Sequence, residues 1–475
     1  MRRDTPPAAF AAAQKHYVFW GESIITLLSI KGDEALDQFY HSVTLDEEKC
    51  KGCINCIKRC PTEAIRVRNG KAKIITERCI DCGECIRVCP NHAKLPITDP
   101  FSVLNHYKYK IALPAPSLYG QFHNLDSIDI ILNGLLDIGF DEVYEVSAAA
   151  EMVYDATRKM MASGTLKKPV ISSACPAVTR LIRVRFPHLI DHVLPLNAPV
   201  ELAARLSKEK AAKKTGFDKK DIGAIFLSPC AAKATAAKMP LGTEHSEIDA
   251  VISISEIYPK LLDVMKTDND NEELSNSGRI GVSWGESGGE SAALLGENYL
   301  AADGIENVIR VLEDIEDEKF PELDFIELNA CSGGCVGGVL MVENPYVAKA
   351  RINRLRKYLP VACNHMKGDI PDYAKFDNDL KHVPVLKLAD DLPTALHKMA
   401  EIEKLEAELP GLDCGTCGAP SCRAFAEDVV RGLANREDCV IELREHLIDE
   451  GGKIDVEELI PAPFRLPRDE GHSAD

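Results

Sequence analysis

Between residues 104 and 365 the chain alternates short, continuous apolar runs with longer stretches in which apolar residues recur at helical spacing. Short apolar runs bounded by polar residues are typical of strands buried on both faces. Four such runs predict strands, at Tyr109–Leu113, Val170–Ser173, Ala224–Leu227 and Phe325–Leu328. Three of the longer stretches predict helices, at Leu125–Gly139, Ala198–Lys214 and Ser253–Lys266. Alternation of this kind predicts an α/β architecture with a largely parallel sheet.

Outside this region the sequence divides into further segments. They are an N-terminal extension without identifiable chemistry (1–43), a cysteine-rich domain (44–98), a polar connector (366–400), a second cysteine-rich domain (401–445) and a tail (446–475). The first cysteine-rich domain contains an internal repeat, because CKGCINCIKRCP from Cys50 recurs 29 residues later as CIDCGECIRVCP from Cys79. A fixed period predicts two copies of one small structural unit.

The charge balance excludes some classes of function. Of 475 residues, 74 are Asp or Glu and 56 are Lys or Arg, which gives a formal net charge of −18. This balance argues against partners such as nucleic acid or anionic membranes. An apolar run near the N-terminus, Val18–Ile30, is broken by Glu22, so we expect neither a cleavable signal nor a membrane span. We therefore expect a cytoplasmic protein.

The chain has 17 cysteines, and they are clustered. Eight lie between Cys50 and Cys89, four lie in the second cysteine-rich domain, and four lie in the α/β region, which leaves only Cys363 unassigned. Without an export signal disulfides are not expected, so the clusters predict metal thiolates in a reducing compartment.

Each half of the repeat carries the spacing C-x2-C-x2-C-x3-C-P. Three closely spaced thiolates can hold three corners of a 4Fe–4S cubane, and in two-cluster ferredoxins the fourth cysteine of each run binds the other cluster. The spacing therefore predicts a bacterial-type dicluster ferredoxin domain with two ligand sets, Cys50, Cys53, Cys56 and Cys89 in the first, and Cys60, Cys79, Cys82 and Cys85 in the second. Zinc is the alternative, but zinc prefers two pairs of cysteines.

The second cysteine-rich domain carries the spacing C-x2-C-x4-C-x16-C. Its string CGTCGAPSCRAFAEDVVRG resembles the small single-cubane domain attached to several anaerobic redox proteins. This resemblance implies a third 4Fe–4S cluster, while the spacing alone is also compatible with zinc. The four expected ligands are Cys414, Cys417, Cys422 and Cys439.

Three cysteines of the α/β region, Cys175, Cys230 and Cys331, each come just after a predicted strand, and Cys335 follows one helical turn beyond Cys331. Parallel strands end at the same edge of a sheet, where ligand sites form. We therefore expect these four cysteines to converge on one metal centre. For any single one of them the alternative is a buried structural cysteine.

These segments resemble the active-site domain of iron-only (FeFe) hydrogenases. That family carries the motifs TSCCPxW, MPCxxKxxE and ExMxCxxGCxxGG; the corresponding segments here are SSACPAV from Ser172, SPCAAKATA from Ser228 and ELNACSGGCVGG from Glu327. The resemblance extends over about residues 44–440 and implies a hydrogenase H-cluster domain at 104–365.

The resemblance also implies the chemistry of the site. The four central cysteines would hold a cubane, and Cys335 would also bridge to a diiron unit that carries carbon monoxide, cyanide and a dithiolate amine. Lys233 matches a lysine that contacts one cyanide, and Ala115, Pro116 and Ser117 match the segment around the other. The implied partners are hydrogen and protons, a redox partner such as ferredoxin, and the maturases that insert the diiron unit.

The sequence departs from the family pattern where protons move. The first cysteine of the family's CC pair, which passes protons to the bridging amine, is Ala174 here, and an alanine methyl group carries no proton. The two pocket methionines are Ser228 and Asn329, and the glutamate that ends the second motif is Ala236. Where the relay should continue, near residues 154–160, only Asp155 is acidic.

These departures resemble the divergent sensory branch of the family without a PAS domain (group D-like). They predict slow hydrogen oxidation and proton reduction, and a sensor that signals to a separate partner protein. The alternative function is an iron–sulfur electron-relay or assembly protein with only a cubane at the four central cysteines. A third interpretation is a fully active enzyme whose protons take another route.

Overall fold

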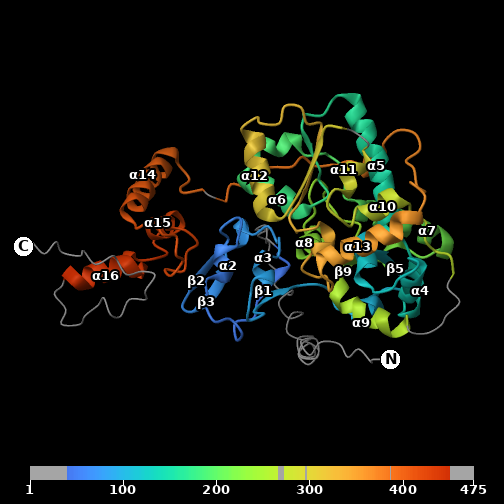
Figure 1. Ribbon diagram of the computed structural model, residues 1–475, viewed down its shortest axis with the longest axis horizontal. Helices are drawn as coiled ribbons and strands as arrows, with labels where there is room; N and C mark the ends of the chain where they lie inside the picture. Colours follow the sequence, from blue (N-terminus) through green and yellow to red (C-terminus); the bar gives the residue numbers. More distant parts are fainter. Residues whose placement is uncertain (1–39, 266–271, 295–296, 386, 450–475) are drawn as a thin grey trace, which may run out of the picture. The chain divides into compact units, whose positions relative to one another are not determined.

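The computed structural model describes residues 40–265, 272–294, 297–385 and 387–449 of the chain (Figure 1). The expected N-terminal extension up to residue 39 and the tail from residue 450 lie outside the described residues. The described residues all fall within one compact unit that starts at Tyr40. Among the described helices, none is long and apolar enough to span a membrane.

The four predicted strands form, but in two parallel sheets rather than one. The four-stranded sheet has the order β6-β5-β8-β9 and the three-stranded sheet the order β10-β11-β7. Their bounds are Tyr109–Pro114 (β5), Glu142–Val143 (β6), Val170–Ile171 (β7), Ile222–Ser228 (β8), Ala250–Ser253 (β9), Tyr299–Asp303 (β10) and Phe325–Asn329 (β11). Each sheet has a core of its own: Ile111 and Phe226 are buried in one, and Ile171 and Ile326 in the other.

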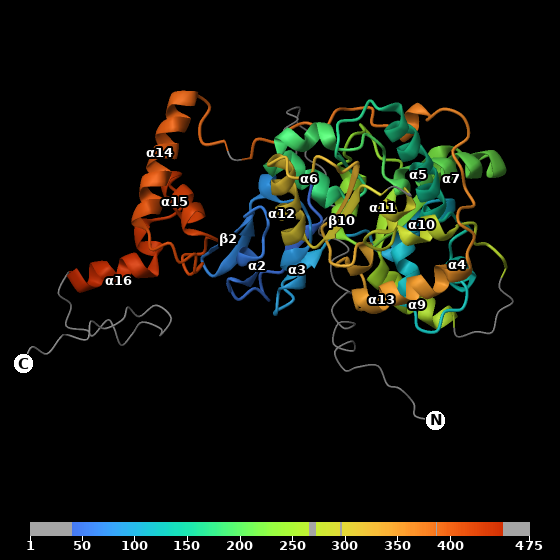
Figure 2. The ribbon, with the colours of Figure 1, turned by 45° about the horizontal axis from the view of Figure 1, so that its top comes forward.

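Helices cover both sheets. The four-stranded sheet packs against α4 (Asp129–Asp137), α7 (Pro199–Thr215) and α9 (Ile254–Val264), which lie where the sequence predicts helices. Beside the three-stranded sheet lie α6 (Pro176–Arg185), α11 (Gly289–Ala293) and α12 (Ile305–Glu316), and Figure 2 shows β10 between α11 and α12. The remaining helices of this region are α5 (Val146–Ser163), α8 (Ala231–Lys238), α10 (Arg279–Ser283) and α13 (Pro345–Leu355).

The cysteine repeat folds as two copies of one unit. In the first copy α2 (Asn55–Lys58) is followed by β2 (Ile65–Arg68), and 29 residues later α3 (Glu84–Arg87) is followed by β4 (Lys94–Pro96). Strand β2 pairs antiparallel with β3 (Lys71–Ile74), and β4 pairs antiparallel with β1 (Val43–Leu45). Elements that recur at the period of the sequence are what an internal repeat predicts.

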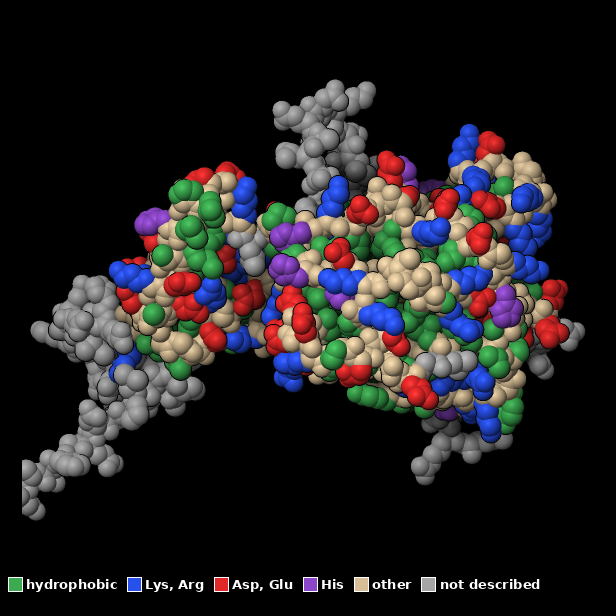
Figure 3. Space-filling model, turned by 90° about the horizontal axis from the view of Figure 1, so that it is seen from above, with side chains coloured by type: hydrophobic (Ala, Val, Ile, Leu, Met, Phe, Trp, Pro, Cys, Tyr) green, Lys and Arg blue, Asp and Glu red, His purple; other side chains and the backbone are tan. Residues whose placement is uncertain are grey.

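The C-terminal cysteine domain is helical, with α14 (Leu392–Glu408), α15 (Cys422–Val430) and α16 (Val440–Asp449). Helix α14 runs across the expected boundary at residue 400. It begins at Asp391, whose side chain accepts a hydrogen bond from the backbone N–H of Thr394 at 2.9 Å, and nothing in its interior stops it before Glu408. On the face seen in Figure 3, acidic and basic side chains lie scattered among hydrophobic and uncharged side chains.

Candidate iron–sulfur sites and active-site cavity

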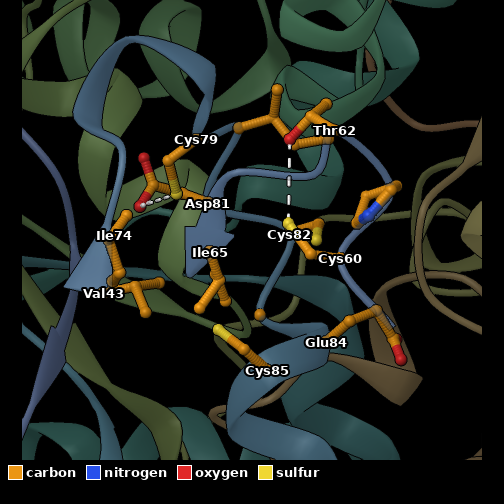
Figure 4. A pocket seen from close by; sticks show the side chains of 13 residues that line it. Val43, Cys60, Thr62, Ile65, Ile74, Cys79, Asp81, Cys82, Glu84 and Cys85 are labelled. Atoms are coloured by element: carbon orange, nitrogen blue, oxygen red, sulfur yellow. Dashed lines mark hydrogen bonds between the residues drawn. The ribbon is translucent and has the colours of Figure 1, made fainter. Parts of the chain in front are cut away.

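The second ferredoxin-type set lines one cavity (Figure 4). Cys60 from the first run and Cys79, Cys82 and Cys85 from the second run share this cavity with Ile65. The structure therefore brings together one cysteine of the first run and three of the second, as the sequence predicts for this set. Burial and the neighbouring thiolates raise the pKa of Cys82 well above its usual value. A thiol in this environment is protonated until a metal replaces its proton.

The first ferredoxin-type set is also assembled from both runs. Burial raises the pKa of Cys56 to about 11, and the neighbouring thiolates of Cys53, Cys89 and Cys50 add to the effect. The two sets share one backbone feature. The N–H of Ala93 points at the sulfur of Cys89 at 3.2 Å, and 29 residues earlier the N–H of Ala64 points at Cys60 at the same distance. Donors aimed at sulfur stabilise a thiolate that carries negative charge.

The four central cysteines come from three strand ends. Cys175 follows β7 and caps α6, Cys230 follows β8 and caps α8, and Cys331 follows β11. Cys335 begins a short 3-10 helix. Burial and the neighbouring thiolates of Cys230, Cys175 and Cys335 raise the pKa of Cys331 above its usual range. The cysteines converge although their strands belong to two sheets, so the site lies where the two sheets meet.

The C-terminal set is grouped in the same way. Cys417 has Cys414 and Cys439 as neighbouring thiolates, and Cys417, Cys422 and Cys439 pack in one apolar cluster with Phe425. The loop that carries the set rests on the ferredoxin domain, because the N–H of Val67 donates to the carbonyl of Gly418 at 2.8 Å.

A buried ion-pair network holds this domain against the ferredoxin domain. Asp428 accepts from the Nε of Arg66 at 2.7 Å and from Arg68 at 2.5 Å, and Glu427 pairs with Arg78 at 2.5 Å. Arg66 and Asp428 are each only 6% exposed. Removal of either partner would leave an uncompensated buried charge, so this contact stabilises the packing of the two domains.

The spacing of the sulfur atoms distinguishes a cubane from a single zinc ion. Four sulfurs around one tetrahedral zinc ion at about 2.3 Å stand about 3.8 Å apart. Among the described residues, the one group of three or more candidate ligand atoms within 4.8 Å of one another is His41, Cys79 and Asp81. None of the four cysteine sets is that compact, so their spacing favours a larger cluster over zinc.

A cavity with ≈ 600 Å³ of open space lies beside the central set. Its lining includes the matched segment Ala115, Pro116 and Ser117, together with Lys233 and Cys335. The Nζ of Lys233 lies 3.5 Å from the sulfur of Cys335. Burial alone would lower the pKa of Lys233, but the thiolates of Cys335, Cys230 and Cys175 outweigh burial and raise it. The lysine is therefore a partly buried cation at the junction of the cysteine set and the cavity.

Two of the residues that line this cavity carry buried hydrogen-bond donors that lack an acceptor among the described residues. The hydroxyl of Ser117 and the Nε1 of Trp284 are buried, and neither has a hydrogen-bond partner among the described residues. Buried polar groups are nearly always paired, so unpaired donors on residues that line a cavity favour a bound group that accepts hydrogen bonds. Together with Lys233 they suit a group with anionic ligands such as cyanide. These residues fit the diiron unit that the sequence implies.

Ala174 lines this cavity, and a buried glutamate lies close to it. The N–H of Ala174 donates to the hydroxyl oxygen of Ser172 at 3.1 Å, and that hydroxyl donates to Glu290 at 2.6 Å. Burial and the nearby carboxylate of Glu327 raise the pKa of Glu290 to about 8. Glu290 was not among the site residues predicted from the sequence, because nothing in the run WGESGGE shows that its last glutamate is buried.

The structure also shows where the other residues that depart from the hydrogenase motifs lie. Asn329 lines the cavity and donates to Glu327 at 2.8 Å, and the hydroxyl of Ser228 donates to the carbonyl of Cys230 at 3.0 Å. Ala236 and Ala174 both line a neighbouring cavity. Asp155 is not part of either lining, because its carboxylate accepts from the N–H of Met366 at 3.0 Å. The acidic residue expected near the relay is thus used to hold a loop.

Two arginines join the ferredoxin domain to the central set. Burial lowers the pKa of Arg180 to about 10, although the charges of Asp81, Cys79 and Cys230 act against this shift. This guanidinium therefore lies near both the second ferredoxin-type set and the central set. Arg87 donates to the carbonyl of Gly337 at 2.9 Å. The second ferredoxin-type set is thus the one that lies next to the central set.

The fold and these cysteine sets define the class of the protein: it is an iron–sulfur protein. A family model described as "Iron only hydrogenase large subunit, C-terminal domain" matches residues 108–339. A "4Fe-4S dicluster domain" model matches residues 42–90, and an Fe-S cluster model matches residues 409–441. Residues 108–339 are thus similar to the C-terminal domain of iron-only hydrogenase large subunits.

Curated relatives include hydrogenases at low identity. Iron hydrogenase 1 of Clostridium pasteurianum is 24% identical over 381 residues, which cover 64% of this chain and 66% of the relative, just under two thirds of its length. The periplasmic Fe hydrogenase large subunit of Nitratidesulfovibrio vulgaris is 26% identical over 361 residues, or 63% of this chain and 86% of the relative. A solved FeFe-hydrogenase structure aligns with a TM-score of 0.47 at 15% identity, over 58% of this chain and 95% of its own.

A relative of another kind is also similar. The cytosolic Fe-S cluster assembly factor NAR1 homolog of Schizosaccharomyces japonicus is 26% identical over 148 residues, which cover 31% of this chain and 28% of the relative. The similarity to hydrogenases extends over more of the chain, but sequence similarity alone does not separate the two functions.

Proposed function

We propose that this protein binds hydrogen and oxidises it slowly and reversibly at an H-cluster, and that it acts as a hydrogen or redox sensor for a separate partner protein. The observation that supports this proposal most is the cavity beside the central cysteines. A bare cubane would leave the donors of Ser117 and Trp284 without acceptors. A diiron unit with cyanide and carbon monoxide ligands would supply those acceptors.

Each residue of the site has a role in this proposal. Cys175, Cys230, Cys331 and Cys335 would hold the cubane, and Cys335 would also help to hold the diiron unit. This unit would supply the iron at which hydrogen is split or formed. Lys233 would offer a partly buried positive charge to one cyanide ligand, and Ser117, with Pro116 beside it, would offer a hydroxyl to the other.

In this proposal, protons must reach the active-site cavity although Ala174 stands in place of the proton-carrying cysteine. Ala174 cannot carry a proton, but Glu290 lines the same cavity and its raised pKa lets it gain and lose a proton near neutral pH. We propose that Glu290 takes over part of this task. A single carboxyl in place of a continuous relay accounts for slow turnover.

Electrons would leave through the accessory clusters. The second ferredoxin-type set lies nearest the central set, and the first set follows it. The C-terminal set lies beside the ferredoxin domain, because Lys58, between Cys56 of the first set and Cys60 of the second, donates to the carbonyl of Asp413 next to Cys414 at 2.6 Å. An external redox partner such as ferredoxin would exchange electrons with these clusters.

A slow enzyme with many clusters suits a sensor better than a producer of hydrogen. Slow turnover leaves the equilibrium binding of hydrogen intact, so the reduction state of the clusters can report on hydrogen. If a partner protein binds the reduced form more tightly, the fraction of the protein that is bound to this partner would then depend on the hydrogen concentration. Cysteines that bind metal rather than form disulfides are typical of a reducing compartment, so a cytoplasmic location is part of this proposal.

The second candidate function is an electron relay or assembly factor with a cubane alone. The similarity to the NAR1 homolog favours it. In that case Lys233 would pair only with the thiolate of Cys335, and the cavity beside it would hold no metal.

Hydrogen itself distinguishes the two candidates. We expect hydrogen to reduce the accessory clusters of the anaerobically matured protein, which electron paramagnetic resonance (EPR) detects as signals of reduced clusters. In Cys335→Ser, hydrogen should give no such signals, while dithionite still reduces the accessory clusters. If dithionite reduces the wild-type clusters and hydrogen does not, the proposed hydrogen chemistry is wrong and the second candidate is favoured.

A further inference from the structure

Lys94 is a fully buried lysine in the ferredoxin domain. It begins β4, it is 2% exposed, and it is one of the largest side chains that the fold buries completely. Its Nζ has no hydrogen-bond partner among the described residues. Burying an unpaired ammonium costs several kcal/mol, so a chain keeps one only where a compensating negative charge is near.

The internal repeat shows that the fold does not require a lysine here. The residue 29 positions earlier is Ile65, which begins β2 as Lys94 begins β4. Ile65 is also 2% exposed, and it lines the cavity of the second ferredoxin-type set (Figure 4). An apolar side chain therefore fills this position in one half of the repeat. The other half places a cation there.

The charges around Lys94 belong to both ferredoxin-type sets. Lys94 acts electrostatically on Cys56 and Cys89 of the first set and on Cys85 of the second, and in each case its positive charge favours the thiolate. The residues on either side of Lys94 in the sequence, Ala93 and Leu95, carry no charge. The ammonium group is thus a cation between two clusters of negatively charged sulfurs.

We propose that Lys94 is a redox-tuning residue that raises the reduction potentials of the two ferredoxin-type clusters. Each reduction adds one electron to a cluster and no proton, so the added negative charge stays in the protein interior. A fixed cation nearby stabilises that charge more than it stabilises the oxidised cluster. The two clusters then retain electrons that come from the active-site cavity.

This inference rests on the iron–sulfur clusters of the proposed function, but not on its hydrogen chemistry. A pair of clusters that holds electrons would lengthen the time for which the protein reports that hydrogen was present. It would serve an electron relay in the same way. The two claims can therefore fail separately.

An EPR-monitored redox titration of the full-length, anaerobically prepared protein tests the inference. In Lys94→Ile, which copies the other half of the repeat, and in Lys94→Gln, we expect the midpoint potential of at least one ferredoxin-type cluster to fall. A tenfold change in the reduction equilibrium corresponds to about 59 mV for a one-electron couple, and we expect at least this shift. Lys94→Arg should keep the wild-type potential.

The matched control is Lys73→Gln, which removes an exposed lysine of the same domain and should leave the potentials unchanged. Iron content, measured for every variant, shows whether the clusters are present. Unchanged potentials in Lys94→Ile and Lys94→Gln at full iron content would overturn the inference. Loss of iron from both variants would overturn it too, because Lys94 would then be needed to hold the clusters. Absence of hydrogen chemistry in the wild type would leave this result unaffected.

Discussion

Glu290→Gln is expected to lower hydrogen turnover about 100-fold, the lower end of what a positioned acid–base group contributes. Glutamine keeps the size of the side chain and still accepts the hydrogen bond from Ser172, but it cannot gain or lose a proton. Hydrogen uptake with an artificial electron acceptor measures the effect. The matched control is Glu201→Gln, a buried carboxyl with a raised pKa that lines the neighbouring cavity.

The pH profile separates a proton carrier from a structural residue. Hydrogen oxidation needs the carboxylate form to accept a proton, so the wild-type rate should rise with pH and level off near the raised pKa of about 8. Glu290→Gln should lack this inflection. If the variant is slow but keeps the wild-type profile, Glu290 positions its neighbours and does not carry the proton.

The same group predicts a pH-dependent stability in the metal-free protein. The folded pKa lies above the unfolded value of 4.5, so the folded state binds more protons between these values, and stability falls as pH rises from 4.5 to about 8. The loss is at most about 1.4 kcal/mol per pH unit. Glu290→Gln should lose less stability over this range, and thermal unfolding at pH 5 and pH 8 measures the difference.

Ala174→Cys is expected to raise hydrogen turnover at least tenfold. Ala174 lines both the active-site cavity and the neighbouring cavity that contains Glu201, so a thiol at this position would face a buried carboxyl in the second cavity. The thiol would thus supply a group that can carry a proton where the methyl group of Ala174 cannot. The control is Ala236→Cys, because Ala236 lines only the neighbouring cavity.

Combining the two substitutions shows whether the routes are independent. If Ala174→Cys opens a second route, turnover in Ala174→Cys/Glu290→Gln should stay well above that of Glu290→Gln alone. If Ala174→Cys leaves the rate unchanged in both backgrounds, the missing cysteine does not limit this protein. The slow, sensory interpretation would then lose its main argument.

Much of the fold was predictable from local patterns. Runs such as Tyr109–Leu113 and Ala224–Leu227 formed strands because continuous apolar segments of that length are stable when both faces are covered. The division into two sheets was not predictable, because strand pairing depends on contacts between distant segments. Helix α14 crosses the expected boundary at residue 400 because helix formation continues where no residue stops it.

The candidate site divides in the same way. Residues in spaced motifs, such as Lys233, were identifiable because the spacing of each motif is typical of a particular kind of site. Glu290 and Lys94 were missed because their importance arises from burial, which a single sequence does not display. The repeat does contain a signal for Lys94. At the equivalent position in the other half the residue is the apolar Ile65, so a charged residue at this position is unexpected.

Infrared spectroscopy of the anaerobically matured protein tests the central claim most directly. Carbon monoxide and cyanide bound to iron absorb in a region free of protein bands, so the cavity beside Cys335 can be examined without interference. We expect such bands in the wild type, a change in their positions when hydrogen is added, and a shift of the cyanide bands in Lys233→Met. A protein with full iron content in its cubanes and no carbon monoxide or cyanide bands after maturation would contradict the account.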